Sequence, residues 1–165
     1  MAQVILAVGS NMGNPKENLD RAIEAINTLG TVQEVAPYIL SKPEGYSQQA
    51  DFVNTVLIMH TETAPMDLLK QLKNLEKQLG RTPTFPNGPR VIDLDILFYD
   101  DKVIFEDTPE YTLFIPHPRL HEREFVLKPL SYILPEFIHP RLHEPIYMLY
   151  RKLMKKKGTP SCQIL

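Results

Sequence analysis

The sequence predicts an α+β fold of ferredoxin-like type, an antiparallel sheet with helices packed on it. Up to residue 99, strand-like and helix-like patterns follow one another in the order strand, helix, strand, strand, helix, strand. A further hairpin pattern follows, and most of the 15 prolines lie between Pro83 and Pro145, which indicates long ordered loops. At 165 residues, 43% of them hydrophobic, the chain suits one domain over 1–165. The expected architecture is a three-layer α/β/α sandwich with an extra hairpin.

Composition excludes several classes of protein. With 18 basic against 20 acidic residues, no overall charge selects nucleic acid or a membrane as partner. The single cysteine, Cys162, excludes an intramolecular disulfide and fits a reducing compartment. No apolar run approaches the roughly 18 residues of a membrane span, and the first ten residues lack the features of a secretion signal. We therefore expect a soluble, cytoplasmic protein.

The first third of the chain predicts a strand, a helix and a broken strand. Gln3–Val8 is a short apolar strand. Asn14 is expected to cap a helix that Gly30 ends, after a Gly/Asn loop that lacks the glycine spacing and the lysine of a P-loop. Val32–Leu40 follows as a strand. Pro37 interrupts it, which argues for an edge position or a bend.

A polar loop and the clearest strand of the chain come next. Ser41–Gln49 is rich in turn residues, as are many loops that carry function. Asp51–His60 predicts a central strand. Asn54 lies on an apolar face of that strand beside Phe52, and a buried amide needs a hydrogen-bond partner. Its side chain either ties down a neighbouring loop or binds a flat polar ligand.

The second helix is expected from Thr63, as N-cap, to Leu79, with Gly80 as C-cap. Its core stripe consists of leucines at helical spacing: Leu68, Leu69, Leu72, Leu75 and Leu79. Arg81 directly follows the turn at Gly80. A proline-rich loop then leads to the next strand.

Residues Gly88–Tyr99 predict a strand that carries two aspartates on one face. Successive strand side chains alternate, so Asp93 and Asp95 share a face with Cβ atoms roughly 7 Å apart. Two like charges at that distance repel by about 2 kcal/mol at an effective dielectric near 20. Mg²⁺ with phosphate oxygens usually relieves such a pair, although a solvated sheet edge is the alternative. The opposite, apolar face consists of Ile92, Leu94, Ile96 and Phe98.

Strict alternation would place Arg90 opposite the two aspartates. Either Arg90 lies in an irregular entry after Pro89, or the strand bends there. Beyond the strand, Asp100-Asp101 is expected to turn the chain into a hairpin with Val103–Phe105.

The later part of the chain contains a short repeat, His117–Glu122 and His139–Glu144, which holds four of the five histidines. Two His four residues apart could bind zinc, but no Glu stands between them as in the reversed zincin signature, so a zinc site is not predicted. Only the first copy is followed by Arg-Glu-Phe. The segment 145–165 is expected to be a basic, solvated C-terminal tail.

Several motifs together resemble a known family. They are Gly9-Ser10-Asn11, Lys42-Pro43-Glu44-Gly45, Asp51-Phe52-Val53-Asn54, Gly80-Arg81, Gly88-Pro89-Arg90-Val91-Ile92-Asp93-Leu94-Asp95-Ile96, and Pro116-His117 with Arg123 and Phe125. From about residue 2 to 135 the chain is similar to the 6-hydroxymethyl-7,8-dihydropterin pyrophosphokinase family of folate biosynthesis. The resemblance implies Mg²⁺-dependent transfer of pyrophosphate from ATP to the pterin hydroxymethyl group, with AMP as the other product.

The resemblance also implies roles for individual residues. Asp93 and Asp95 would bind two Mg²⁺ ions, and Arg81 and Arg90 would contact the phosphoryl groups. The pterin would stack between two rings, in a pocket formed by Ser41, Pro43, Glu44, Gly45, Phe52, Asn54 and Phe125. The nucleotide would contact Lys73, Glu76, Ile96, His117 and Arg123.

The chain departs from the family just before Gly88. Pro86 and Asn87 stand where the family often has a basic residue and a Trp, on a mobile loop that closes over ATP. Two other classes remain open from sequence: a nucleotide-sugar transferase with an Asp-x-Asp metal site, which would normally need a larger domain, and a non-catalytic ferredoxin-like binding module.

Overall fold

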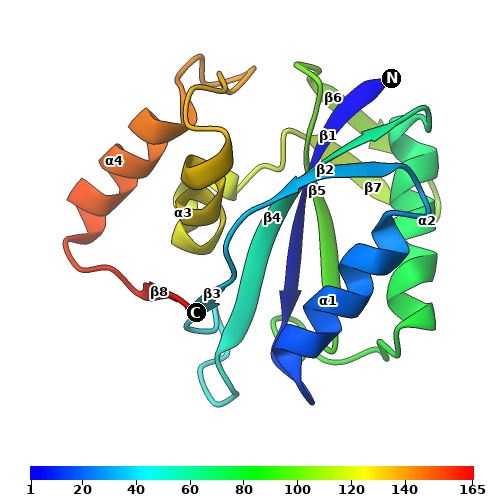
Figure 1. The fold of residues 1–165 in the computed structure, drawn as a ribbon, viewed down its shortest axis with the longest axis horizontal. Coiled ribbons are helices and arrows are strands. Elements are labelled where there is room, and N and C mark those ends of the chain that lie inside the picture. The colour runs from blue at the N-terminus through cyan, green and yellow to red at the C-terminus, as the bar shows by residue number, and fades with distance from the viewer.

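All residues, 1–165, are described by a computed structural model in which one antiparallel sheet lies between two pairs of helices (Figure 1). Helices α1 and α2 cover one face of the sheet, and α3 and α4 cover the other. The elements are β1 (Ala2–Ser10), α1 (Pro15–Ile26), β2 (Thr31–Val35), β3 (Ile39–Ser41), β4 (Phe52–Thr61), α2 (Pro65–Gln78), β5 (Asp93–Tyr99), β6 (Ile104–Asp107), β7 (Thr112–Ile115), the 3₁₀ turn η1 (Leu120–Glu122), α3 (Glu124–Ile133), α4 (Ile146–Lys157) and β8 (Cys162–Ile164).

The strand order confirms the predicted ferredoxin-like sheet. The order is β5-β1-β4-β3-β8, with β2 also paired to β4. Pro37 divides the expected strand 32–40 into β2 and β3, because a proline has no N–H to donate to the ladder. Both pieces pair antiparallel with β4, so together they fill the position of one strand.

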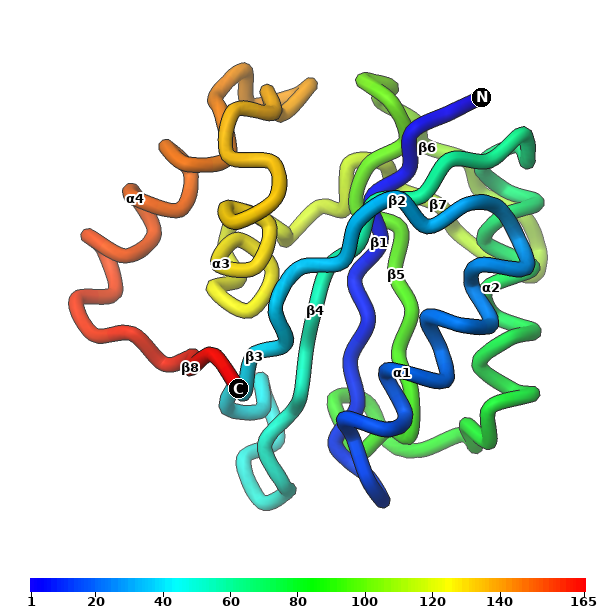
Figure 2. The backbone as a smooth tube through the Cα atoms, viewed as in Figure 1, coloured from blue at the N-terminus to red at the C-terminus, as the bar shows by residue number.

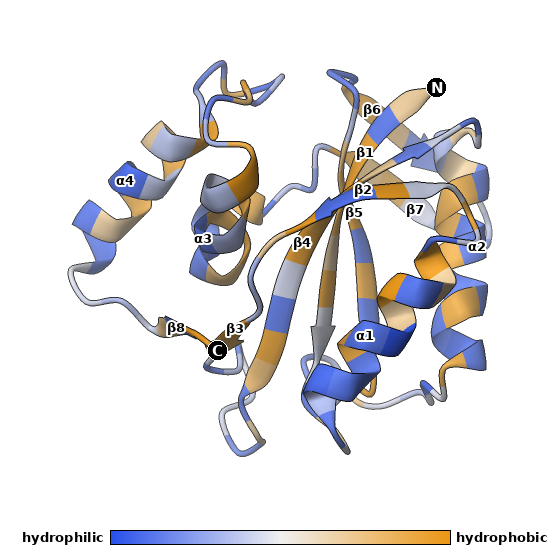
Figure 3. Cartoon of the chain, viewed as in Figure 1, coloured by the Kyte–Doolittle hydropathy of each residue, from blue (hydrophilic) through white to orange (hydrophobic).

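Alternation along the central strands produces two apolar cores. Val53, Leu57 and Met59 of β4 pack toward α1 and α2, whereas Val56 packs toward α3 and α4 with Ile5 of β1. The strands therefore carry apolar residues on both faces, while the helices mix apolar and polar residues (Figure 3). Burial on both faces holds the sheet rigidly between the two helical layers.

The structure confirms one predicted helix cap and corrects two others. Asn14 accepts a hydrogen bond from the backbone N–H of Glu17 at 3.2 Å. However, α1 ends at Ile26, and Gly30 instead lies against β4, where a Cβ would come within 2.4 Å of the His60 carbonyl oxygen. Thr63 is not the cap of α2. Ala64 takes that position, since the fixed φ of Pro65 suits the first helical residue.

Strand β5 is shorter than predicted and contains a bulge. Leu6 pairs with Ile96 and Ile5 with Phe98, so Leu97 is an extra residue in the ladder. Beyond the bulge the alternation reverses. The prediction that Phe98 shares the face of Leu94 is therefore wrong: Phe98 packs in the core beneath α3 and α4.

The predicted hairpin between β5 and the strand at Val103–Phe105 is also wrong. Strand β6 pairs with β7 in a separate two-stranded sheet, and Asp100 accepts a hydrogen bond from the backbone N–H of Gln3 on β1. The tail expected at 145–165 is ordered as α4 and β8, and β8 pairs with β3 at the sheet edge (Figure 2). None of the helices combines the length and apolar character that spanning a membrane would need.

Gly30→Ala should lower the free energy of unfolding by about 1–3 kcal/mol, because its methyl group would overpack the His60 carbonyl and the Met59 side chain. Urea denaturation followed by circular dichroism measures the change. Thr31→Ala, at the next and exposed position, is the matched control and should stay within about 0.5 kcal/mol. Equal stability of the Gly30→Ala variant and the unmodified protein would contradict the close contact.

Candidate active site

Both aspartates of β5 line a pocket at one end of the sheet. Its walls come from β1, β4 and β5, from the start of α3, and from the loops that precede β4 and β5. Nine of the predicted site residues meet there: Ser41, Glu44, Phe52, Asn54, Arg90, Asp93, Asp95, Arg123 and Phe125. Pro43 lies in an adjoining cleft behind this pocket. Gly45 lies on the neighbouring loop with φ of 79° and does not line the pocket.

A second cleft begins at Asp95 and extends between α2 and β7. It brings together Lys73, Ile96 and His117, which were all predicted as nucleotide contacts. The remaining lining residues are Leu69, Tyr111, Thr112, Leu113, Phe114 and Pro118. Asp95 is the residue that both hollows share, so the acidic pair stands where they meet.

Two arginines hold Asp93. Arg81 donates from Nη1 to Oδ1 at 2.9 Å, and Arg90 donates from Nη1 to Oδ2 at 3.1 Å. Burial opposes ionisation of Asp93, but Arg90, Lys73 and Arg81 outweigh it and lower the pKa of this carboxyl. Asp93 is therefore a fixed, ionised group at the base of the pocket.

Asp95 stands in a different electrostatic environment. Burial, together with the negative charge of Asp93, raises the pKa of Asp95 to about 7. Lys73 and Arg123 act in the opposite direction but are outweighed. A cation beside the pair would favour ionised Asp95. The two-carboxylate motif predicts the same, since two neighbouring negative charges repel each other unless a cation lies near them.

Glu76 supports this arrangement from below. Its side chain is almost completely buried, and Oε2 accepts hydrogen bonds from Arg81 Nη1 at 2.8 Å and from the backbone N–H of Leu94 at 2.7 Å. Lys73 Nζ lies 3.4 Å from Oε1. The Glu76 carboxylate thus holds two groups in place: the backbone of Leu94, which lies between the two aspartates, and the side chain of Arg81, which binds Asp93.

Asn54 has features of both alternatives left open by the sequence, a tie to a neighbouring segment and a place beside a ligand. Its Nδ2 donates to Ser41 Oγ at 2.5 Å, which joins β4 to the last residue of β3, and the amide also lines the pocket. Next to it, a Cβ on Gly9 would come within 2.6 Å of Asn54 Oδ1. Glycine at position 9 therefore leaves room for the amide.

Arginines cover both aromatic rings of the pocket. The Arg90 guanidinium lies 4.8 Å from the centre of the Phe52 ring, and that of Arg123 lies 5.5 Å from the centre of Phe125. Arg123 Nη2 also donates to Glu44 at 3.1 Å, but its Nε is buried without a hydrogen-bond partner. An orphaned donor of this kind needs an acceptor, and a ligand oxygen or nitrogen would supply one.

Asn11 is a site residue that sequence reasoning missed. Its Oδ1 accepts from the backbone N–H of Arg90 at 2.8 Å, and its Nδ2 donates to Gln49 Oε1 at 2.8 Å. Gln49 Nε2 donates in turn to the Asn87 carbonyl at 2.6 Å. These bonds join the loops before β4 and β5, and they place Arg90 in an irregular entry rather than on the strand. The signal in the sequence was its place in the Gly9-Ser10-Asn11 motif, to which no role had been given.

The loop before β5 still carries an aromatic residue. Phe85 meets Tyr46 of the other loop edge to face, with ring centres 5.0 Å apart, and both rings are exposed. Asn87 lines the pocket directly. The two loops thus contact each other beside the pocket although the basic residue and the Trp are absent.

The histidine repeat forms two similar turns. The first His of each copy accepts, through Nδ1, the backbone N–H of the residue two positions later, at 3.2 Å for His117 and 3.1 Å for His139. Burial first and Arg123 second lower the pKa of His117 to about 4, so its ring is neutral at pH 7. No group of three or more His, Cys, Asp or Glu residues could hold a metal ion.

A ferredoxin-like sheet with paired aspartates and arginines beside two adjoining hollows defines the class of protein as a small α+β domain with a site suited to phosphate-bearing ligands. The chain belongs to the 7,8-dihydro-6-hydroxymethylpterin-pyrophosphokinase family, whose model matches residues 5–135.

Curated relatives support the assignment. The chain is 38% identical over 167 residues to the 2-amino-4-hydroxy-6-hydroxymethyldihydropteridine pyrophosphokinase of Aquifex aeolicus, covering 100% of this chain and 99% of that protein. It is 43% identical over 140 residues to the folic acid synthesis protein FOL1 of Dictyostelium discoideum, covering 85% of this chain but spanning only 21% of that longer protein.

Solved structures agree on the fold. The HPPK-DHPS of Plasmodium falciparum superposes with a TM-score of 0.80 at 15% identity, covering 99% of this chain and 48% of that one. At this identity the likeness concerns the fold alone. The chain spans less than half of that structure.

In metal-free protein, stability should depend on Asp95. Its folded pKa of about 7 lies above the ordinary value of 3.8, so the folded state binds more protons between these values and stability falls as pH rises through this window. Asp95→Asn should therefore stabilise the protein by about 4 kcal/mol at pH 8 and by less than about 1 kcal/mol at pH 4. Urea denaturation in EDTA at both pH values checks this. An equal gain at pH 4 and pH 8 would contradict the raised pKa.

Proposed function

We propose that this chain transfers pyrophosphate from ATP to the hydroxymethyl group of 6-hydroxymethyl-7,8-dihydropterin, with Mg²⁺, giving AMP in folate biosynthesis. The observation that carries the proposal is the position of Asp95, where an aromatic pocket and a second cleft meet. A two-substrate reaction needs such a junction. The protein would act as a cytoplasmic monomer on these small molecules.

The two aspartates fit a hard dication. They are oxygen ligands, Asp95 lacks a neutralising arginine of its own, and Mg²⁺ is usually held by one or two carboxylates plus substrate phosphates. Two ions would be shared between Asp93, Asp95 and the phosphate oxygens, which must complete the coordination because no third carboxylate or histidine is close enough. When bound, Mg²⁺ would neutralise charge on the phosphates and acidify the pterin hydroxyl.

The pterin would occupy the aromatic pocket. Its ring would stack between Phe52 and Phe125, with Ser41 and Asn54 at its polar edge. Pro43, Glu44 and Gly45 would shape the loop over that edge. Because Arg90 now covers the Phe52 ring, the pterin would displace its guanidinium toward the phosphates, where Asp93 already attracts it.

The second cleft would hold the nucleotide. Lys73, Ile96 and His117 line this cleft, whereas Arg123, also expected at the nucleotide, lines the aromatic pocket and acts on Asp95 through its charge. Glu76, expected at the nucleotide from the family resemblance, is 3% exposed. We therefore assign it the positioning of Lys73 and Arg81 rather than a direct contact.

The chemistry would depend mainly on positioning and charge. Arg81 and Arg90 suit phosphate oxygens, since a guanidinium donates two parallel hydrogen bonds. The neutral His117 lies on the nucleotide side, and we assign the aspartates of the pocket to the metal rather than to proton abstraction from the hydroxyl. We propose direct transfer between the bound substrates, without a covalent enzyme intermediate.

Product analysis tests the function. The chain, ATP, Mg²⁺ and 6-hydroxymethyl-7,8-dihydropterin should yield AMP and the pterin diphosphate in equal amounts, separated by ion-exchange chromatography. Omission of the pterin, or addition of EDTA, should stop AMP formation. ADP as the product would indicate a different transfer, and binding of both ligands without AMP would favour the non-catalytic module.

Asp93→Asn and Asp95→Asn should each lower kcat by about a thousandfold, corresponding to about 4 kcal/mol of barrier, because each removes a charge that holds Mg²⁺. Steady-state AMP formation measures the loss, and circular dichroism checks the fold. Asp101→Asn is the matched control, since Asp101 is exposed in the turn after β5. Near-full activity in either aspartate variant of β5 would refute the metal assignment.

A further inference from the structure

Glu124 is a buried carboxylate that the proposed reaction does not use. It is the first residue of α3 and is only 2% exposed. A buried charge is costly unless it is paired and hydrogen-bonded. The partners of Glu124 are therefore informative about its role.

Those partners all come from the C-terminal end of the chain. The backbone N–H of Ser161 donates to both carboxylate oxygens, at 3.0 and 3.1 Å, and the backbone N–H of Cys162 donates to Oε2 at 3.1 Å. Ser161 Oγ lies 3.1 Å and Lys157 Nζ 3.0 Å from Oε1. We call Glu124, Lys157, Ser161 and Cys162 the Glu124 clamp.

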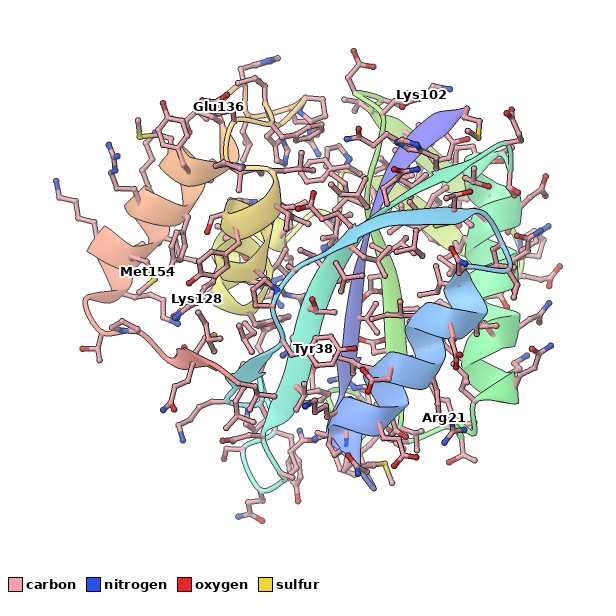
Figure 4. The ribbon with its side chains drawn as sticks, in the orientation of Figure 1. Arg21, Tyr38, Lys102, Lys128, Glu136 and Met154 are labelled. Carbon is pink, nitrogen blue, oxygen red and sulfur yellow. The ribbon has the colours of Figure 1, made fainter.

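Within the clamp, the hydrogen-bond partners of Glu124 favour its ionised form. Burial opposes the charge, but the hydrogen bonds from Ser161 and Lys157 outweigh it and lower the pKa of Glu124. Lys128, labelled in Figure 4, adds a second tie from α3 by donating Nζ to the Cys162 carbonyl at 3.0 Å. The start of α3 and the C-terminal strand β8 are thus fixed to each other.

Each side of the clamp continues into a wall of the pterin pocket. On one side, Arg123 and Phe125 flank Glu124 in sequence and line the pocket. On the other side, Cys162 pairs with Ser41 in the β3–β8 ladder, and Ser41 accepts the hydrogen bond from Asn54. Figure 1 shows β8 next to β3, between α4 and the pocket end of the sheet.

We propose that Glu124 is a positioning residue for the pterin: through Ser161 and Cys162 it sets the distance between the Phe125 wall and the Ser41–Asn54 wall. This inference rests on the proposed function. Glu124 touches no substrate in this arrangement. None of the four clamp residues lines the nucleotide cleft; all four line the hollow behind Ser41 and Phe125 instead.

Glu124→Gln tests the inference, because the amide keeps the shape but places an NH₂ group against N–H donors and an ammonium. With Mg²⁺ and α,β-methylene-ATP present, calorimetry should show a Kd for the pterin about tenfold higher, while the Kd for the nucleotide analogue changes less than twofold. In turnover, KM for the pterin should rise about tenfold and kcat should stay within threefold. Glu122→Gln, an exposed acid two residues earlier, is the matched control and should leave all values unchanged.

A double variant, Lys157→Met with Ser161→Ala, keeps Glu124 and its backbone N–H donors but removes the Lys157 ammonium and the Ser161 hydroxyl, so it carries the test if Glu124→Gln does not fold. It should raise the pterin Kd severalfold. Unchanged pterin binding in a folded Glu124→Gln or in the double variant would overturn the inference. An equal loss of pterin and nucleotide binding would do so as well. Failure of the unmodified protein to bind pterin would instead refute the proposed function, and the inference with it.

Discussion

The site depends on how the chain holds two negative charges close together. Asp93 is balanced by Arg81 and Arg90, and Arg81 is itself held by the buried Glu76. The same glutamate binds the backbone N–H of Leu94, between the aspartates. Without this framework the repulsion between the carboxylates would favour a strand end that frays. With it, Asp93 stays ionised, while Asp95 has no basic side chain in an ion pair with it.

Around this centre the molecule separates two tasks. The aromatic pocket is built from β1, β4 and β5, the end of β3, the start of α3 and two loops, whereas the second cleft lies between α2, β5 and β7. Only Asp95 belongs to both. Because each side has its own supporting elements, substitutions behind one hollow should affect one ligand more than the other, and the Glu124 clamp is the clearest support behind the aromatic pocket.

Two buried glutamates, one in α2 and one in α3, hold neighbouring strands in place and have no proposed contact with a substrate. Glu76 and Glu124 each accept backbone N–H groups of a strand and an ion pair from a basic side chain. In both cases the strand carries or adjoins site residues. An ionised carboxylate can accept several hydrogen bonds at once. One side chain can therefore bind backbone N–H groups at a strand end that have no partner in the sheet ladder.

The sequence by itself determined the order of elements up to residue 99, the ferredoxin-like sheet, the Asn14 cap, the Asp93–Asp95 pair and most pocket residues, because periodicity and short motifs are local properties. Tertiary structure decided the rest. The bulge at Leu97 depends on register against β1, the partner of β6 depends on the path of β7, and β8 exists only because β3 offers an edge. The roles of Glu76, Asn11 and Glu124 follow from hydrogen bonds to residues 18, 79 and 38 positions away, respectively, which no local pattern encodes.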